Sequence, residues 1–152
     1  MFRETHPDVD VSLYYAQTPQ QIPALRQRRV LIVFERLLPN ESDIQVTLVA
    51  RERLLLAVSN RHALARRKVV PVSALKDQTL RVGTAPAGMT TAEELCRSSG
   101  FEPRFAGEAS DVVMATLLTA IGDEITLVPA SMANVRIPGV TYLDLDPSVN
   151  SF

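Results

Sequence analysis

The feature that most constrains this chain is the alternation of short apolar runs with helix-length stretches in its second half. Residues 80–83, 104–106, 125–128 and 140–145 are short β-rich runs. Two stretches of about ten residues separate the first three runs, a length typical of helices. These stretches end at Gly100 and Gly122, and glycine commonly terminates a helix. Strands alternating with helices predict right-handed crossovers onto a mostly parallel sheet, so the expected fold class is α/β.

Capping signals refine the two helices. Thr90, followed three residues later by Glu93, predicts a capping box and a helix from residue 90 or 91 to 99. Ser110 is the expected cap of the second helix, which carries an apolar stripe at helical spacing made of Val113, Met114, Leu117, Leu118 and Ile121. Residues 129–131 are expected to open a short helical turn.

The first half predicts a strand, a helix and a strand. Residues 9–15 alternate as a half-buried strand does, and residues 30–34 form a continuous apolar run typical of a parallel strand covered on both faces. Between them, Thr18, Pro19 and Gln21 predict a capping box and a helix to about residue 27. Pro23 predicts a bend or a delayed start.

After these elements, the chain is expected to change lobe. Residues 44–59 hold two β-rich runs around residues 51–53. A polar loop at 60–68 and a short helix at 71–77 then follow.

Composition excludes several classes of function. With 152 residues, 46% of them hydrophobic, the chain can bury a core as one domain or two small lobes. Sixteen basic against seventeen acidic residues argue against DNA binding by this stretch itself. Cys96 is the single cysteine, which excludes an internal disulfide. No apolar window approaches a membrane span and the first ten residues are polar, so a cytoplasmic protein with no membrane partner is expected.

Neither a metal site nor catalytic machinery is expected. His6 and His62 lie far apart in the sequence with no third histidine or cysteine ligand near either, and both are expected at the surface. Cys96 is interpreted as a small buried side chain, and no nucleophile or paired-carboxylate motif is present. The sequence therefore predicts no enzyme and no cofactor.

Ligands of open α/β sheets bind beyond the carboxyl ends of the strands, beside helix N-termini. This rule selects residues 17–18, 34–36, 83–89, 107–110 and 128–131. The loop 83–88 combines flexible backbone, a hydroxyl and a helix start, which suits a carboxylate, but it lacks the Lys-Ser/Thr ending of a nucleotide-binding loop.

Each candidate also has a purely structural interpretation. Thr18 can be only a helix cap, Thr84 only a loop residue, Phe34 part of the core and Arg36 a solvated surface charge. The basic run at 61–68 can contact nucleic acid, but it lacks aromatic residues and is typical of an exposed loop.

Several motifs occur in order along the chain: residues 2–9, Thr18-x-x-Gln21-x-x-Ala24-Leu25, residues 51–54, residues 62–65, Cys96-Arg97-x-x-Gly100-Phe101-x-Pro103, residues 127–131 and residues 137–140. Their order resembles the effector-binding domain of LysR-type transcriptional regulators, especially the subgroup regulating aromatic degradation. The resemblance implies a periplasmic-binding-protein type 2-like fold of two doubly wound, Rossmann-like lobes, the first incomplete. The expected parts are a first lobe at 1–59, a crossover at 60–78, a second lobe at 79–145 and a return segment at 146–152.

The resemblance also implies a function. A small inducer, often an aromatic acid or another carboxylate such as benzoate or muconate, would lie between the lobes and control transcription. The expected ligand contacts are Thr18, Phe34, Arg36, Gly83, Thr84, Pro86, Val128 and Pro129. Expected partners are the chain itself, as homodimer or homotetramer, and DNA only through the winged helix-turn-helix that the family carries outside this stretch. The alternatives are a solute-binding component of a transport system and, third, a small α/β enzyme.

Three positions depart from the family's usual pattern. Arg28 stands where a glycine is usual at a helix stop, and Leu31 stands where an aspartate is usual. Glu124 replaces a second usual glycine. The first change is expected to cost backbone freedom and the second to remove a polar contact.

Overall fold

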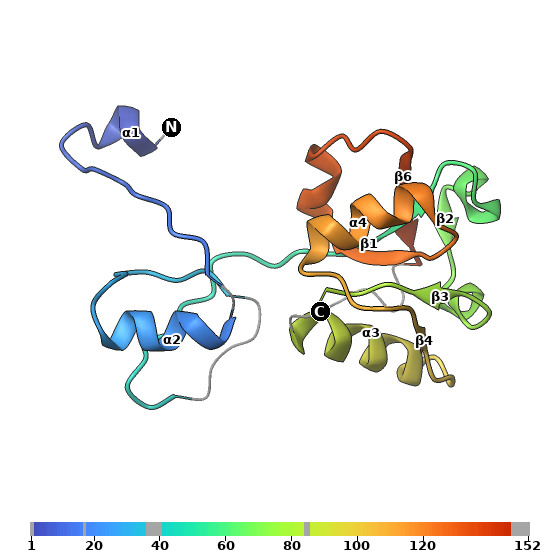
Figure 1. Ribbon diagram of the computed structural model, residues 1–152, viewed down its shortest axis with the longest axis horizontal. Helices are drawn as coiled ribbons and strands as arrows, with labels where there is room; N and C mark the ends of the chain where they lie inside the picture. The colour runs from blue at the N-terminus through green and yellow to red at the C-terminus, as the bar shows by residue number, and fades with distance from the viewer. Residues whose placement is uncertain (1, 17, 36–40, 84–85, 147–152) are drawn as a thin grey trace. The chain divides into compact units, whose positions relative to one another are not determined.

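The computed structural model describes residues 2–16, 18–35, 41–83 and 86–146. The chain divides into two compact units, Met1–Leu38 and Pro39–Phe152, and each is described by itself (Figure 1).

The first unit contains two helices, α1 (Phe2–Thr5) and α2 (Thr18–Arg26). The predicted helix after residue 17 is therefore confirmed, and it contains Pro23 without a delayed start. The side chain of Gln21 reaches back as expected, but its Nε2 donates to the carbonyl of Ala16 at 3.1 Å instead of completing a capping box.

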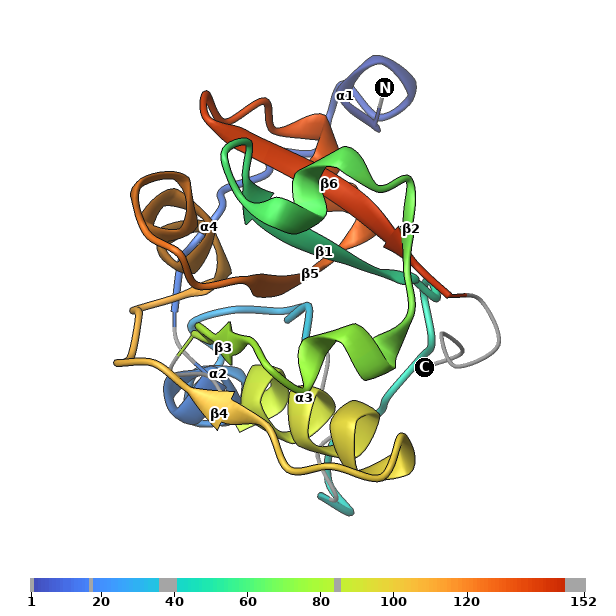
Figure 2. The same cartoon turned by 90° about the vertical axis from the view of Figure 1, so that its right-hand side faces the viewer.

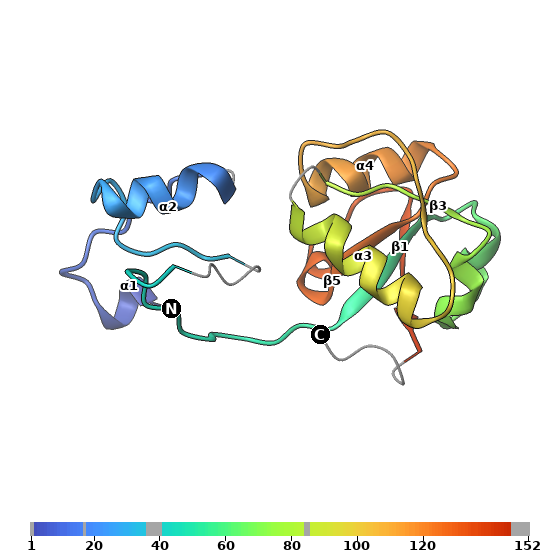
Figure 3. The same ribbon diagram turned by 90° about the horizontal axis from the view of Figure 1, so that it is seen from below.

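The first-half strands predicted at 9–15, 30–34 and 44–50 do not form. None of these described residues belongs to a strand, and residues 28–35 pass beside α2 as an irregular trace (Figure 3). Leu13 is 94% and Leu31 90% exposed. A strand exists only through ladder hydrogen bonds with a neighbour, and the described residues supply none to these runs.

Helix α2 ends in a turn that places Arg28 in the left-handed region, at φ 55°. The Arg28 amide donates to the Leu25 carbonyl and the Arg29 amide to the Ala24 carbonyl, each at 2.9 Å. This is the Schellman arrangement, whose left-handed position is usually glycine. Arg28, which stands where a glycine is usual, therefore adopts the left-handed conformation that was expected to cost backbone freedom.

The second unit holds the remaining regular structure. Its helices are the 3₁₀ helices η1 (Ala63–Arg66), η2 (Val72–Leu75) and η3 (Ala130–Asn134), and the α-helices α3 (Pro86–Ser98) and α4 (Val112–Ile121). Its strands are β1 (Leu54–Ser59), β2 (Val69–Val70), β3 (Thr79–Leu80), β4 (Arg104–Phe105), β5 (Thr126–Pro129) and β6 (Val140–Leu145).

The strands form a mixed sheet. Four of them lie in the order β2-β6-β1-β5, while β3 pairs with β4 and meets β5 through a parallel bridge between Leu80 and Ile125 (Figure 2). Among the described strands β1 alone is antiparallel to its neighbours. The α/β class is confirmed, and the parallel directions predicted for β3, β4 and β5 are correct, whereas β1 was not expected to enter this sheet.

The boundary between the units therefore differs from the predicted one at residue 59. Strand β1 pairs with both β5 and β6, so it cannot belong to another lobe. The predicted crossover at 60–78 also belongs to the second unit, because Leu64, Val70 and Leu75 are buried in its main core. The β-rich character of residues 54–59 was read correctly, but their partners lie more than 60 residues later, beyond the reach of local patterns.

Both faces of the central sheet are covered. Leu56 and Val58 of β1 pack into one core with Leu95 of α3, and the alternate residues Leu55 and Ala57 pack into a second core. Helix α4 packs against β1 and β5 (Figure 2). The continuous apolar sequence of β1 follows from this burial on both sides.

Helix α4 presents its apolar stripe to solvent. Ala115, Thr116 and Thr119 are its buried residues, because small side chains allow close approach to the sheet. The stripe residues Val113, Met114, Leu117 and Ile121 are between 42% and 76% exposed. The stripe was correctly recognised in the sequence, but it is a free surface in this chain.

Two predicted helix starts are shifted. Helix α3 begins at Pro86 rather than at residue 90 or 91, consistent with proline's preference for the first helical position. Helix α4 is capped by Asp111 rather than Ser110, since the Asp111 carboxylate accepts from the Met114 amide at 2.8 Å. Among the residues described, no helix has the length and apolarity needed to cross a membrane.

Candidate functional site

The carboxyl ends of β3, β4 and β5 lie at one edge of the second unit. Beyond β3, Gly83 forms a parallel bridge with Ala109, and the Ala109 amide donates to the Val82 carbonyl at 3.3 Å. Gly83 of the predicted ligand segment 83–89 is thus brought beside Ala109 of the predicted segment 107–110. This is the edge where open α/β sheets bind ligands.

Gly83 occupies a position that no other residue fits without movement. A Cβ atom there would lie 2.9 Å from the carbonyl carbon of Asp111 and 3.2 Å from the Val112 amide nitrogen. These contacts are with backbone at the start of α4, which cannot rotate away as a side chain can. Glycine at 83 therefore permits the close approach of the two loops.

Two helices begin at this edge. Helix α3 starts at Pro86, three residues after Gly83, and α4 starts next to the Gly83 backbone. The first amides of a helix lack intrahelical partners, and the helix dipole favours negative charge there. At the start of α4, the Asp111 carboxylate already accepts from the Met114 amide.

Arg81 links the loop at Gly107 to Glu124 and was not singled out in the sequence. Its Nη1 donates to the Gly107 carbonyl at 2.8 Å, and its Nη2 lies 2.9 Å from Glu124 Oε1. The two side chains are 16% and 28% exposed. Glu124, one of the three departures, is therefore the partner of a partly buried arginine. In the sequence, only the departure at Glu124 pointed to this ion pair, because its partner Arg81 lies 43 residues earlier.

Val128 and Pro129 lie at the carboxyl end of β5, but both are buried. Val128 is 0% exposed and packs in the second core. Both residues pair with β1, opposite Leu55 and Leu54. A ligand contact from Val128 would have to come from its backbone, and its side chain holds the strand in place.

The other predicted ligand residues are described less fully. Phe34 is 77% exposed, so it is not the core residue of the alternative interpretation. Thr18 is the first residue of α2 and Pro86 the first of α3. Arg36 and Thr84 lie outside the described residues. The assignment of all these residues to a ligand site stays a prediction.

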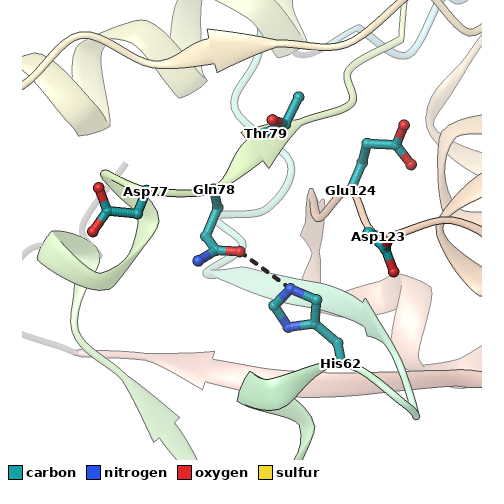
Figure 4. Close-up of a pocket in the computed structure, with 6 residues that line it drawn as sticks. All are labelled: His62, Asp77, Gln78, Thr79, Asp123 and Glu124. Atoms are coloured by element: carbon teal, nitrogen blue, oxygen red, sulfur yellow. Dashed lines mark hydrogen bonds between the residues drawn. The ribbon is translucent and has the colours of Figure 1, made fainter.

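A polar hollow of about 340 Å³ lies elsewhere in the second unit, lined by His62, Asp77, Gln78, Thr79, Asp123 and Glu124 (Figure 4). His62 accepts from the Leu64 amide through Nδ1 and lies 3.1 Å from Gln78 Oε1 through Nε2. It was expected at the surface, but it is half-buried and caps η1, which explains its place in the motif. In the described part of the chain no group of three side chains is placed to hold a metal.

Cys96 is fully buried, as predicted. Burial raises the pKa of its thiol to about 11, with a smaller contribution from the charge of Glu102. A thiol with this pKa is protonated at neutral pH and is a poor nucleophile. The residue therefore serves packing.

Comparison with known proteins gives the fold and the site a context. Residues 1–150 match a family model described as the LysR substrate binding domain. The transcriptional regulator BenM of Acinetobacter baylyi is 31% identical over 153 residues, which are 97% of this chain and 50% of BenM. The regulator TfdS of Cupriavidus pinatubonensis is 32% identical over 147 residues, covering 95% of this chain and 50% of TfdS. The chain thus spans about half the length of these relatives.

Solved structures agree. The LysR-family regulator CbnR matches with a TM-score of 0.86 at 27% identity, over 99% of this chain and 53% of CbnR. The effector-binding domain of BenM, solved with its effector benzoate, matches with a TM-score of 0.77 at 28% identity, over 99% of this chain and 70% of that domain.

Proposed function

Because the chain belongs to the family of LysR substrate-binding domains, we propose that it is the effector sensor of a transcriptional regulator and that its effector is a small carboxylate. The observation that carries this proposal is the edge of the second unit where Gly83, the start of α3 and the start of α4 converge. Backbone amides at helix starts bind anions without needing a buried cation.

The effector class is proposed from relatives and from this chemistry. BenM binds benzoate. In the present chain the amides that follow Gly83 would hold the carboxylate, while Pro86 and Thr84 would contact the remainder. Thr18, Phe34 and Arg36 are proposed as further contacts, together with the backbone of Val128 and Pro129. An effector that binds one arrangement of the regulator more tightly than another shifts their populations and so alters transcription.

The wider assignments belong to the same proposal. Residues 1–38 form part of one lobe and residues 54–145 the other. DNA is contacted only by a helix-turn-helix domain beyond the matched region, and the protein works in the cytoplasm. Curated relatives are transcriptional regulators, which favours this function over the alternative of a transport component.

Self-association is proposed to use the exposed stripe of α4. Val113, Met114, Leu117 and Ile121 give this helix an apolar surface that water would otherwise cover. Replacing Leu117 and Ile121 by glutamate should shift the chain toward monomer in sedimentation velocity experiments. The paired control replaces exposed Lys76 and Arg104 by glutamate and should leave the sedimentation coefficient unchanged.

Thermal denaturation of the purified chain with a panel of aromatic and dicarboxylic acids tests the sensor proposal. A ligand at 100 times its dissociation constant that binds only the folded state adds roughly 2.7 kcal/mol. One acid should raise the midpoint selectively while its amide or alcohol analogue does not. A cooperative transition that no acid shifts would contradict the proposal.

A further inference from the structure

The second unit carries a separate groove that the proposed effector site does not use. It has a volume of about 480 Å³ and lies over β6, between η1 and the start of β2 on one side and η3 on the other. Figure 2 shows β6 between β2 and β1. Strand β2 pairs with β6 only at Asp144 and Leu145, so the groove-lining residues 141–143 have β1 but not β2 as a strand partner.

Positive charge lines this groove. Arg53, Arg67 and Lys68 contribute to its walls, and Asp144 is the one acidic residue among the residues that line it. Arg53 is ion-paired with Asp144, so this pair adds no net charge. Among the described residues the side chains of Arg67 and Lys68 have no ion-pair partner, and both are exposed.

Apolar and aromatic groups also line the groove. The accessible part of the lining includes Ala65, Ala133 and Tyr142, while Leu55 and Leu143, only 5% and 3% exposed, lie beneath it in the cores. The Tyr142 hydroxyl donates to the Val135 carbonyl at 3.1 Å, which holds the ring in place over β6. The groove therefore combines a fixed, partly apolar floor with unpaired cations on one wall.

We propose that this groove binds an acidic, extended protein segment that places a hydrophobic side chain on the floor and carboxylates on Arg67 and Lys68. Neighbouring cations at Arg61 and Arg66 lie on the same run of chain and are also exposed. They extend the positive surface beyond the groove, so a segment with several carboxylates can engage more than one cation at a time.

Two other anionic ligands fit the groove less well. A lone exposed ion pair contributes little, so a small carboxylate held only by exposed cations would bind weakly. Duplex DNA gains affinity from many phosphate contacts, and here the cations are few and Asp144 lies among them. A phosphate backbone would also gain no binding energy from an apolar floor. These considerations favour a peptide.

The experiment measures fluorescence anisotropy of a labelled twelve-residue peptide in which aspartate and glutamate alternate with leucine and phenylalanine, titrated with the 152-residue chain. The acidic peptide should bind, and a peptide with asparagine and glutamine in place of its acids should not. Affinity should fall as salt is raised. Charge reversal by R67E and K68E should weaken binding at least about tenfold.

Matched variants separate the groove from net charge. The pair K76E and R104E makes the same change of charge outside the groove and should alter affinity less than about twofold. A133W, which obstructs the floor without changing charge, should also weaken binding. Circular dichroism melts establish that each variant is folded.

Absence of peptide binding, or an equal loss of affinity in both charge-reversal variants, would overturn the proposal. So would displacement of the labelled peptide by duplex DNA when the phosphate concentration only equals that of the peptide's carboxylates. Displacement by benzoate that is as effective, per carboxylate, as displacement by unlabelled peptide would also overturn it. The last two would identify a phosphate surface and a small-carboxylate site.

Discussion

Replacing Arg28 by glycine should stabilise α2. Arg28 sits at φ 55°, and a residue with a Cβ pays roughly 1–2 kcal/mol for that left-handed conformation. Glycine escapes this cost but gives the unfolded chain more freedom, which offsets about 0.5–1 kcal/mol. The expected net gain is about 0.5–1 kcal/mol, with the amides of residues 28 and 29 keeping their bonds to Leu25 and Ala24.

Native-state hydrogen exchange followed by mass spectrometry is the suitable assay, because α2 lies in the smaller of two units and a global melt would be dominated by the larger one. Peptides covering residues 18–30 should exchange about two- to fivefold more slowly in R28G. The control is R29G, since Arg29 has no positive φ: glycine there relieves no strain, adds the entropic cost and removes the exposed hydrogen bond from Arg29 Nε to Gln27 Oε1. Exchange in R28G as fast as in the parent chain, or faster, would show that the left-handed residue is not strained.

Three further predictions concern the second unit. E124G should lower the free energy of unfolding by about 1–2 kcal/mol in urea, because Arg81 keeps its partly buried position and loses its ion-pair partner; E124Q, which retains an acceptor, should cost less. G83A should lower the thermal midpoint by an amount equivalent to about 1–3 kcal/mol because its Cβ would meet backbone at 2.9 Å, whereas G107A, with its nearest neighbour at 4.0 Å, should cost far less. Burial raises the pKa of Cys96 to about 11 from 9.0. The stability that the protonated thiol contributes is therefore complete below pH 9 and is lost as pH rises toward 11. In urea titrations, a C96A variant should lack this part of the decline in stability at alkaline pH.

Local sequence patterns predicted most elements of the second unit. The range of β6 and the positions of α4 and η2 follow from capping residues and from runs of apolar residues, which act over a few positions. Long-range pairing could not be read in the same way. Strand β1 joins partners far along the chain, and nothing within residues 54–59 distinguishes this sheet from another.

In the first unit, local patterns predicted strands that do not form. Residues 9–15 and 30–34 have strand-like sequences, yet none of the described residues pairs with them. A pattern of burial predicts which side of a strand would be covered, but it does not supply the neighbouring strand.

The candidate site was predicted both as loop segments and as individual residues within them. Gly83 and Ala109, one from each of the segments 83–89 and 107–110, do meet beyond β3 and β4, because the carboxyl ends of parallel strands share an edge. Arg81, which bonds Gly107 and Glu124, carries no motif of its own, and its role depends on the loop carbonyl of Gly107. The sequence also did not predict which face of α4 is exposed, because a helix that is apolar on most sides has no pattern that identifies its buried side.

The most direct test of the central claim is a two-dimensional amide NMR titration of the chain with the acid selected by the thermal panel. The account predicts that the largest shifts fall on the amides of residues 83–85, 87–89 and 107–111, while the groove over β6 is unaffected. Saturating shifts confined to other parts of the second unit, with these two segments unaffected, would contradict it.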